Sequence, residues 1–223
     1  MSQLNLKKNI PMTWLLPAAM LSLALLLDIA PKELRGAVMK NLEEAILVKN
    51  AGHFDSGMHG TYFLIKQLME AGRNDLIYQM TSKKDFPSWG NMLAQDATTS
   101  WESWTGGSHI HDTLISIGAW FIEGIGGIQA DEKAPGFRHF FLRPAPVGDL
   151  TFARTRYRSL HGTIVSNWRI ENGVLCLDAT VPPGTTATLY LPSAAPALAT
   201  TMPPMLMLLS AWSSSTLSFF PIG

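Results

Sequence analysis

The spacing of apolar residues changes once along this chain, and this change limits the possible folds more than any other feature. In the first part, apolar residues recur about every 3.6 positions, in segments Lys32–Val48, Thr61–Ala71, Asp75–Met80 and His111–Ile128. After Pro135 apolar and polar residues alternate, in Phe137–Leu142, Phe152–Tyr157, Thr163–Ile170, Val174–Val181 and Ala187–Leu191. The pattern predicts a helical region followed by a small antiparallel β-domain.

Turn residues sharpen this division. Asn172 and Gly173 lie between two alternating segments, a strong signal for a β-hairpin. The period changes near Asp131–Gly136, which predicts a helical domain over residues 1–133 and a β-domain over 134–195. Residues 196–223 carry no charge and show no clear period, so they are expected to form an apolar tail of uncertain structure.

Composition excludes several classes of function. Of 223 residues, 47% are hydrophobic and 15% are charged, which is typical of a globular chain. Seventeen basic and seventeen acidic residues give a net charge of zero, so a nucleic-acid partner is not expected. Cys176 is the single cysteine, and no His, Asp and Glu residues have convincing metal-ligand spacing. We expect no metal, and without a glycine-rich phosphate loop we expect no cofactor.

The apolar segment Trp14–Leu27 follows Lys7 and Lys8 and allows two interpretations. A basic start and an apolar middle are typical of a signal peptide. However, Pro17 interrupts the segment, no small-residue cleavage site follows, and its length is below the roughly 20 residues of a membrane span. A buried amphipathic helix that ends at Asp28–Pro31 is favoured, and no membrane association is expected.

The segment Phe86–His111, most of which lies in long loops expected between Asp85 and His109, is rich in residues that recognise sugars. It holds three tryptophans together with carboxylates and histidines, namely Trp89, Asp96, Trp101, Glu102, Trp104, His109 and His111. Tryptophan rings stack on the C–H faces of a sugar while carboxylates bind its hydroxyls, which favours a carbohydrate site. From composition alone, tryptophans that anchor a core and a solvated Glu102 would explain the same pattern.

Successive motifs along the chain resemble those of bacterial α-L-rhamnosidases, glycoside hydrolase family 78. They are GHFDSGMHGT (52–61), GRNDLIY (72–78), FPSWG (86–90), ATTSWESW (97–104), SHIH (108–111) and APGFRHF (134–140). Their order and spacing match as well as their residues, over about Leu21 to Pro192. The resemblance implies a multidomain α and β fold, part of an (α/α)6 barrel followed by an antiparallel β-sandwich. It also implies an enzyme that cleaves terminal α-L-rhamnosides with inversion, on a rhamnose-containing glycoside or oligosaccharide.

The resemblance assigns roles to individual residues. Glu102 matches the family's general base, and an inverting glycosidase needs such a carboxylate to activate water. His111 matches a histidine of the substrate pocket, although the residue before it, Ile110, departs from the family pattern. The remaining substrate-binding candidates are Trp89, Trp101 and Trp104 on the pocket wall and His53 and Asp55 in a loop at the same barrel end. Asp96 stands where the family more often has glycine and receives no role.

The family's general acid lies upstream of the matched motifs, so the chain is expected to be a fragment that lacks it. Three alternatives remain. The chain is either part of an enzyme or a non-catalytic carbohydrate-binding or structural remnant of one, and a membrane-anchored protein is a third, weaker reading. An open half barrel would expose apolar surface, so self-association is a further expectation. The sequence does not distinguish a cytoplasmic from an exported protein.

Overall fold

A computed structural model of the chain describes residues 17–112, 114–191, 205–210 and 215–219. The chain divides into two compact units. We call residues 1–68 and 80–114 the helical unit, and residues 69–79 and 115–223 the sheet unit. The predicted domain boundary between residues 133 and 134 remains a prediction.

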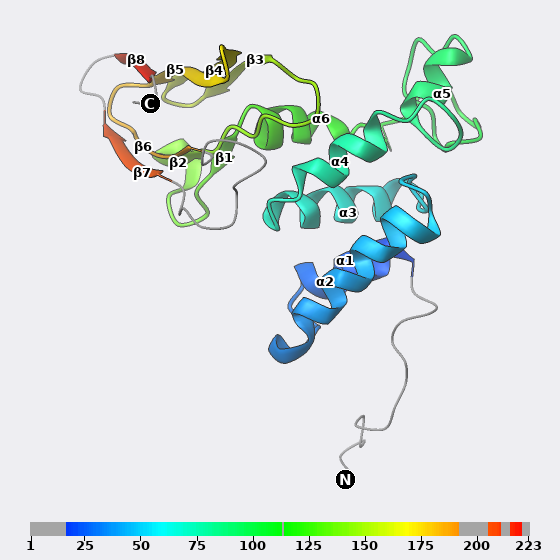
Figure 1. The fold of residues 1–223 in the computed structure, drawn as a ribbon. Helices are drawn as coiled ribbons and strands as arrows, with labels where there is room; N and C mark the ends of the chain where they lie inside the picture. The colour runs from blue at the N-terminus through cyan, green and yellow to red at the C-terminus, as the bar shows by residue number, and fades with distance from the viewer. Residues whose placement is uncertain (1–16, 113, 192–204, 211–214, 220–223) are drawn as a thin grey trace. The chain divides into compact units, whose positions relative to one another are not determined.

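The helical unit begins with short helices that bury one face each. The elements in order are α1 (Ala18–Leu26), the 3₁₀ segment η1 (Lys32–Leu34), α2 (Arg35–Glu44) and the π-helical segment η2 (Ala45–Lys49). In α1 the buried apolar side chains include Leu21 and Leu25, and in α2 and η2 they include Val38, Leu42 and Ile46. These positions are four apart, which places them on one side of each helix. Helices α1 and α2 lie side by side in Figure 1.

A glycine allows helix α3 (Met58–Glu70) to start close to α1. A Cβ atom at Gly60 would lie 2.8 Å from the Cβ of Ala19 and 2.5 Å from the Cβ of Ser56, which is closer than atoms can approach. Helix α4 (Asn74–Thr81) follows, and then α5 (Trp89–Ala94). Among the described residues no helix combines the length and the apolarity needed to cross a bilayer.

The long loop predicted between Asp85 and His109 contains the short helix α5. Ser88 caps it: the Oγ atom accepts a hydrogen bond from the backbone N–H of Asn91 at 3.0 Å and donates one to the carbonyl of Asp85 at 2.7 Å. Serine satisfies the free N–H groups of a first helical turn in this way. A six-residue helix has too few turns to produce an apolar period, so the sequence predicted only a loop here.

The helix predicted from His111 to Ile128 begins later than expected. Its regular part consists of α6 (Ile117–Ala119) and the π-helical segment η3 (Trp120–Ile125). The backbone N–H of His111 donates to the carbonyl of Ser100 at 3.2 Å, so it belongs to a loop contact instead of a helical turn. Leu114 shares the apolar spacing of Ile117, Phe121 and Ile125 but lies before the regular part of the helix.

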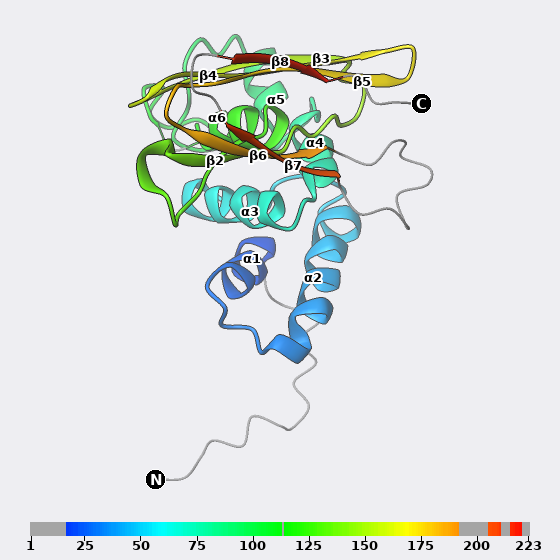
Figure 2. The same ribbon diagram turned by 90° about the vertical axis from the view of Figure 1, so that its left-hand side faces the viewer.

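The sheet unit contains two four-stranded sheets, which Figure 2 shows as two layers. The first sheet has the order β1-β2-β6-β7, and its strands are β1 (Ile128–Ala130), β2 (His139–Leu142), β6 (Thr186–Leu191) and β7 (Met205–Ser210). The second has the order β3-β4-β5-β8, with β3 (Phe152–Ser159), β4 (Gly162–Glu171), β5 (Val174–Val181) and β8 (Ser215–Phe219). A 3₁₀ turn, η4 (Pro135–Phe137), precedes β2.

The predicted hairpin and the predicted antiparallel pairing are largely confirmed. Asn172 (φ 52°) and Gly173 (φ 79°) connect β4 to β5 with Glu171 opposite Val174. One pair differs from the prediction, since β2 and β6 run parallel, with His139 opposite Thr186. The apolar period of a strand does not encode the direction of its neighbour. Of residues 196–223, the described parts form β7 and β8, and the other positions lie outside the described residues.

The core of the sheet unit is closed by contacts between η3 and β4. The indole N–H of Trp168 donates to the carbonyl of Ile125 at 2.8 Å, and the Ser166 hydroxyl donates to the carbonyl of Gly126 at 2.6 Å. A Cβ at Gly126 would lie 2.3 Å from the Thr155 hydroxyl oxygen. The helical segment is thus held against the inner face of the β3-β4 pair, where buried polar groups have partners.

Candidate active site

The ATTSWESW and SHIH motifs face each other across one loop. In the segment 99–111, which we call the paired loop, the backbone folds back on itself. Glu102 N–H donates to the carbonyl of Ser108 at 2.9 Å, Ser103 N–H donates to the carbonyl of Gly106 at 3.1 Å, and His111 N–H donates to that of Ser100. The hydroxyl of Thr99 also donates to the carbonyl of His109. Two motifs that the sequence places apart therefore form a single hairpin-like structure.

Glu102 is exposed, and the paired loop orients its carboxylate. Its Oε2 atom accepts a hydrogen bond from the backbone N–H of Ser108 at 3.0 Å. Gly107 lies beside this carboxylate with φ +86°, a conformation that favours glycine. A Cβ at Gly107 would lie 2.8 Å from Oε2. The loop therefore leaves no room for a side chain where the carboxylate sits.

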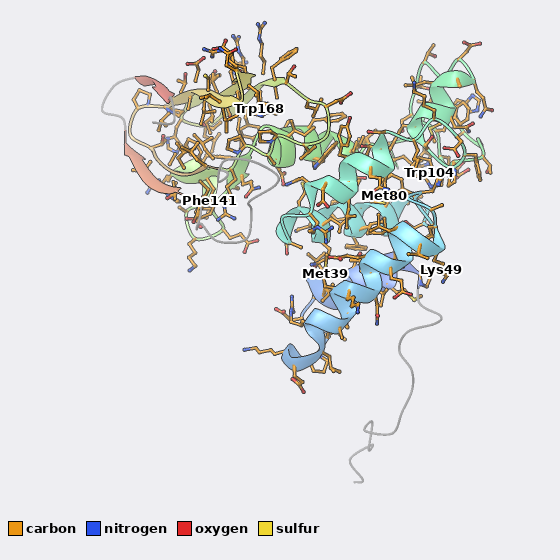
Figure 3. The ribbon with its side chains drawn as sticks, in the orientation of Figure 1. Met39, Lys49, Met80, Trp104, Phe141 and Trp168 are labelled. Carbon is orange, nitrogen blue, oxygen red and sulfur yellow. The ribbon has the colours of Figure 1, made fainter. Side chains whose placement is uncertain are left out.

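A cluster of three aromatic rings joins three of the motifs. Phe54 stacks on Trp104 with ring centroids 5.4 Å apart, and Trp89 meets both rings edge to face at 5.0 Å. The indole N–H of Trp104 donates to the carbonyl of Ser56 at 2.7 Å. Figure 3 labels Trp104 in the helical unit. Edge-to-face and offset packing of this kind adds to the stability from burial and holds the three loops together.

The tryptophans of the candidate site differ in exposure. Trp101 and Trp104 are buried, and Trp89 is half-buried. The Trp101 ring stacks on the imidazole of His109, with centroids 4.7 Å apart and an interplanar angle of 9°. Trp101 and Trp104 thus pack within the loops, whereas Trp89 keeps part of its ring accessible. The interpretation that tryptophans anchor a core therefore applies to Trp101 and Trp104.

His53 links the GHFDSGMHGT motif to the segment before α5. Its Nε2 lies 2.9 Å from Oδ1 of Asp85, and its Nδ1 lies 3.2 Å from the carbonyl oxygen of Asn50. The hydrogen bond with His53 is the main cause that lowers the pKa of the Asp85 carboxyl below its ordinary value. Asp85 and Asn50 were not predicted as site residues. The position of Asp85 directly before the FPSWG motif was the only signal for it.

Asp55 has its partners at the start of α1. Its Oδ2 accepts a hydrogen bond from the backbone N–H of Ala18 at 2.9 Å and another from the Asn50 side chain at 3.0 Å. The residue before α1, Pro17, offers no side-chain cap. The carboxylate of Asp55 therefore satisfies a free N–H of the first helical turn, from a residue far along the chain.

His111 has an imidazole nitrogen without a hydrogen bond. Its Nδ1 is buried and has no hydrogen-bond partner in the described structure, and the nearest carboxylate oxygen, on Asp112, lies 3.7 Å away. A buried polar atom without a partner is uncommon in native proteins. No group of three or more His, Cys, Asp or Glu among the described residues is arranged to hold a metal ion.

Two protein-family models match the chain one after the other. The bacterial alpha-L-rhamnosidase 6 hairpin glycosidase domain matches residues 18–125, and the bacterial alpha-L-rhamnosidase C-terminal domain matches residues 127–202. Curated relatives carry the same name. An alpha-L-rhamnosidase of Streptomyces avermitilis is 34% identical over 183 residues, which cover 77% of this chain and 18% of the relative. One of Formosa agariphila is 32% identical, with 77% and 19% covered.

Solved structures agree with these relatives. The alpha-L-rhamnosidase from Dictyoglumus thermophilum is similar with a TM-score of 0.81 and 25% identity, covering 92% of this chain and 25% of that chain. The Streptomyces avermitilis enzyme complexed with L-rhamnose gives a TM-score of 0.79 and 28% identity, covering 91% of this chain and 21% of that one. The chain thus spans about a fifth to a quarter of the length of these relatives. It belongs to the bacterial α-L-rhamnosidase family, with a six-hairpin glycosidase region followed by a sheet domain.

Proposed function

We propose that this chain contributes the general base and part of the sugar-binding wall to a site that hydrolyses terminal α-L-rhamnosides with inversion. The observation that carries the proposal is the exposed carboxylate of Glu102, held by the Ser108 N–H in the matched base motif. The relatives named alpha-L-rhamnosidase and the neighbour complexed with L-rhamnose support the substrate class.

The reaction assigns separate tasks to two carboxyl groups. Glu102 takes a proton from a water molecule, which attacks the anomeric carbon from the face opposite the leaving group. A carboxylic acid, about 6.5–9.5 Å away, protonates the glycosidic oxygen as its bond to carbon breaks. We propose that this acid comes from a barrel segment outside these 223 residues. The Ser108 N–H donates a hydrogen bond to the Oε2 atom of Glu102, which orients this carboxylate toward its proposed task.

The other site residues divide by exposure into contact and positioning roles. Trp89, half-buried at the start of α5, is proposed to stack on the sugar ring, while Trp101 and Trp104 position the paired loop from beneath. The unpartnered Nδ1 of His111 is proposed to hydrogen-bond a sugar hydroxyl or the attacking water. His53 and Asp55 are proposed to line the same end of the barrel.

The test removes the proposed base by mutation and supplies a nucleophile that can attack without losing a proton. In a longer polypeptide that completes the barrel around this chain, Glu102→Ala is expected to lower kcat on an aryl α-L-rhamnoside by about 10²- to 10⁴-fold. Added azide is expected to restore cleavage and to give a glycosyl azide of inverted configuration, because it attacks from the face that water would use. Glu132→Ala, an exposed carboxylate of the sheet unit, is the matched control and should retain full activity.

Each alternative gives a different result. Unimpaired hydrolysis by Glu102→Ala would remove the assignment of the base. An azide product of retained configuration would indicate a double displacement, in which Glu102 is the acid/base group and another residue is the nucleophile. A completed barrel that binds rhamnose without turnover would favour the non-catalytic remnant. The 223-residue chain by itself is the control that is expected to lack the general acid. If it hydrolysed the rhamnoside at an ordinary enzymatic rate, the acid would lie within this sequence.

A further inference from the structure

The outer face of β3 carries three arginines in a row. Arg154, Arg156 and Arg158 alternate with inward-facing residues and are exposed. Alternate residues of a strand lie about 6.6–6.8 Å apart on one face. Their cross-strand neighbours on β4 are uncharged, namely Asn167, Val165 and Thr163. Strand β3 is the first in its sheet order, so this row follows a sheet edge.

The positive charge of this row is not neutralised within the described structure. The two acidic side chains beside it are held by a fourth arginine: Arg169 Nε donates to Glu171 at 2.7 Å, and Nη1 donates to Asp178 at 2.9 Å. None of the three β3 arginines forms an ion pair with any described residue. Like charges so close together repel, and an anion bound across them would relieve the repulsion.

An open hollow lies against the same face. Its volume is about 600 Å³, and it is lined by an aromatic ring, cationic and amide groups and carboxylates, chiefly Phe152, Arg154, Asn167, Arg169, Glu171 and Asp178. Phe152 is 61% exposed, and the Arg154 guanidinium carbon lies 6.0 Å from the centre of its ring. Figure 3 shows nitrogen-tipped side chains extending outward from this sheet, above Trp168.

We propose that this face, defined by the three β3 arginines and the adjoining hollow, binds a polysaccharide that carries uronic acid groups. A guanidinium group matches a carboxylate with two parallel hydrogen bonds, and the flat Phe152 ring offers a surface for the C–H face of a sugar. Carboxylates of Glu171 and Asp178 at the hollow accept hydrogen bonds from sugar hydroxyls, whereas they would repel the phosphates of a nucleic acid. The choice of a saccharide rests on the proposed glycosidase function.

The experiment measures binding without catalysis, by affinity electrophoresis and calorimetry of the whole chain with polygalacturonate. The triple variant Arg154→Gln, Arg156→Gln, Arg158→Gln is expected to lose at least about 10-fold in affinity, since each exposed ion pair contributes up to about fivefold. A control with the same loss of charge, Lys40→Gln, Lys133→Gln, Arg138→Gln, should stay within about twofold of the parent. The three residues of this control are exposed elsewhere on the chain.

A second triple variant with lysine at positions 154, 156 and 158 keeps the charge and the sheet but removes the guanidinium fork. Its affinity should fall between those of the parent and the glutamine variant. Equal binding to neutral dextran, heparin or single-stranded DNA would overturn the assignment, as would no binding to polygalacturonate. Since no turnover is needed, binding of polygalacturonate by this chain together with a completed barrel that never cleaves a rhamnoside would uphold this inference and refute the proposed function.

Discussion

Gly107 illustrates how the backbone beside a side chain limits the position of that side chain. The chain turns there with φ +86°, and the missing side chain leaves space that the Glu102 carboxylate fills. Gly106, its neighbour, has φ +111°. A Cβ atom added there would lie 3.8 Å from the Nε2 atom of His109, which is an ordinary contact distance. The two glycines bear similar backbone strain but lie in different surroundings. Substitutions at the two positions therefore separate the effect of backbone strain from the effect of moving the Glu102 carboxylate.

We predict that Gly107→Ala in the completed barrel lowers kcat by about 10- to 100-fold, because a displaced base no longer aligns with the attacking water. Gly106→Ala should lower the free energy of unfolding by a similar amount, about 1 kcal/mol, but should change kcat little. Steady-state kinetics on an aryl rhamnoside, paired with thermal unfolding, measure both effects. Equal loss of kcat in the two variants would contradict the placement of the carboxylate.

The His53–Asp85 pair gives the helical unit a pH dependence. Because folding lowers the pKa of Asp85, the ionised carboxylate favours the folded state; its contribution is complete above the ordinary pKa and is lost as the pH falls through the lowered one. Asp85→Asn is therefore expected to melt lower than the parent at pH 7, with the difference shrinking as the pH falls below about 4. Melting curves by circular dichroism test this. Asp96→Asn, at an exposed carboxyl with no ion pair in the described structure, should show no such convergence.

Helix α1 depends on a cap supplied from another part of the chain. Its first N–H bonds to Asp55, and Pro17 cannot replace that acceptor. We predict that Asp55→Ala lowers the free energy of unfolding by about 1 kcal/mol, as loss of a cap does. Asp55→Asn keeps an acceptor oxygen and should retain most of this stability. Denaturant unfolding measures the difference, and an unchanged midpoint in Asp55→Ala would contradict the capping role. A separate rise in KM would support its place in the pocket.

Elements with a strong local signal were predicted well, and those set by distant contacts were not. Asn172 and Gly173 specify a tight turn locally, and the alternation of Ile164, Trp168 and Ile170 depends only on the strand that holds them. The start of the last helix depends on a hydrogen bond between His111 and Ser100, which no local period reveals. The direction of β6 beside β2 likewise follows from contacts about 47 residues apart, as His139 pairs with Thr186.

The candidate site also divides into features with a local signal in the sequence and features set by distant contacts. Glu102, Trp89 and His111 were found through motifs, and the structure gives their surroundings. The motifs did not reveal that Asp85 would meet His53, since that pairing needs two loops to approach in space. Nor did they distinguish the buried Trp101 and Trp104 from the half-buried Trp89, because the same residue type serves both purposes.

Among the described residues, several apolar side chains in and next to the first helices are exposed to solvent. They include Met20, Leu27, Ile29 and Val48, the last of which is 74% exposed. We predict that the isolated chain self-associates, because exposed apolar surface of this kind promotes contact between molecules. Ile29→Glu with Val48→Glu should shift sedimentation toward the monomer. Leu160→Glu, at an even more exposed turn of the sheet unit, is the control and should have no effect.

The parallel pairing of β2 with β6 affects the order in which the two sheets can form while the chain is being synthesised. A ribosome completes β1 and β2 long before it adds Thr186, and meanwhile Phe140 and Leu142 lack one neighbouring strand of their final sheet. The β3, β4 and β5 hairpins need only short loops and can close first. Nascent chains halted before β6 would expose an unfinished sheet edge, the type of surface that chaperones bind and that aggregates grow from.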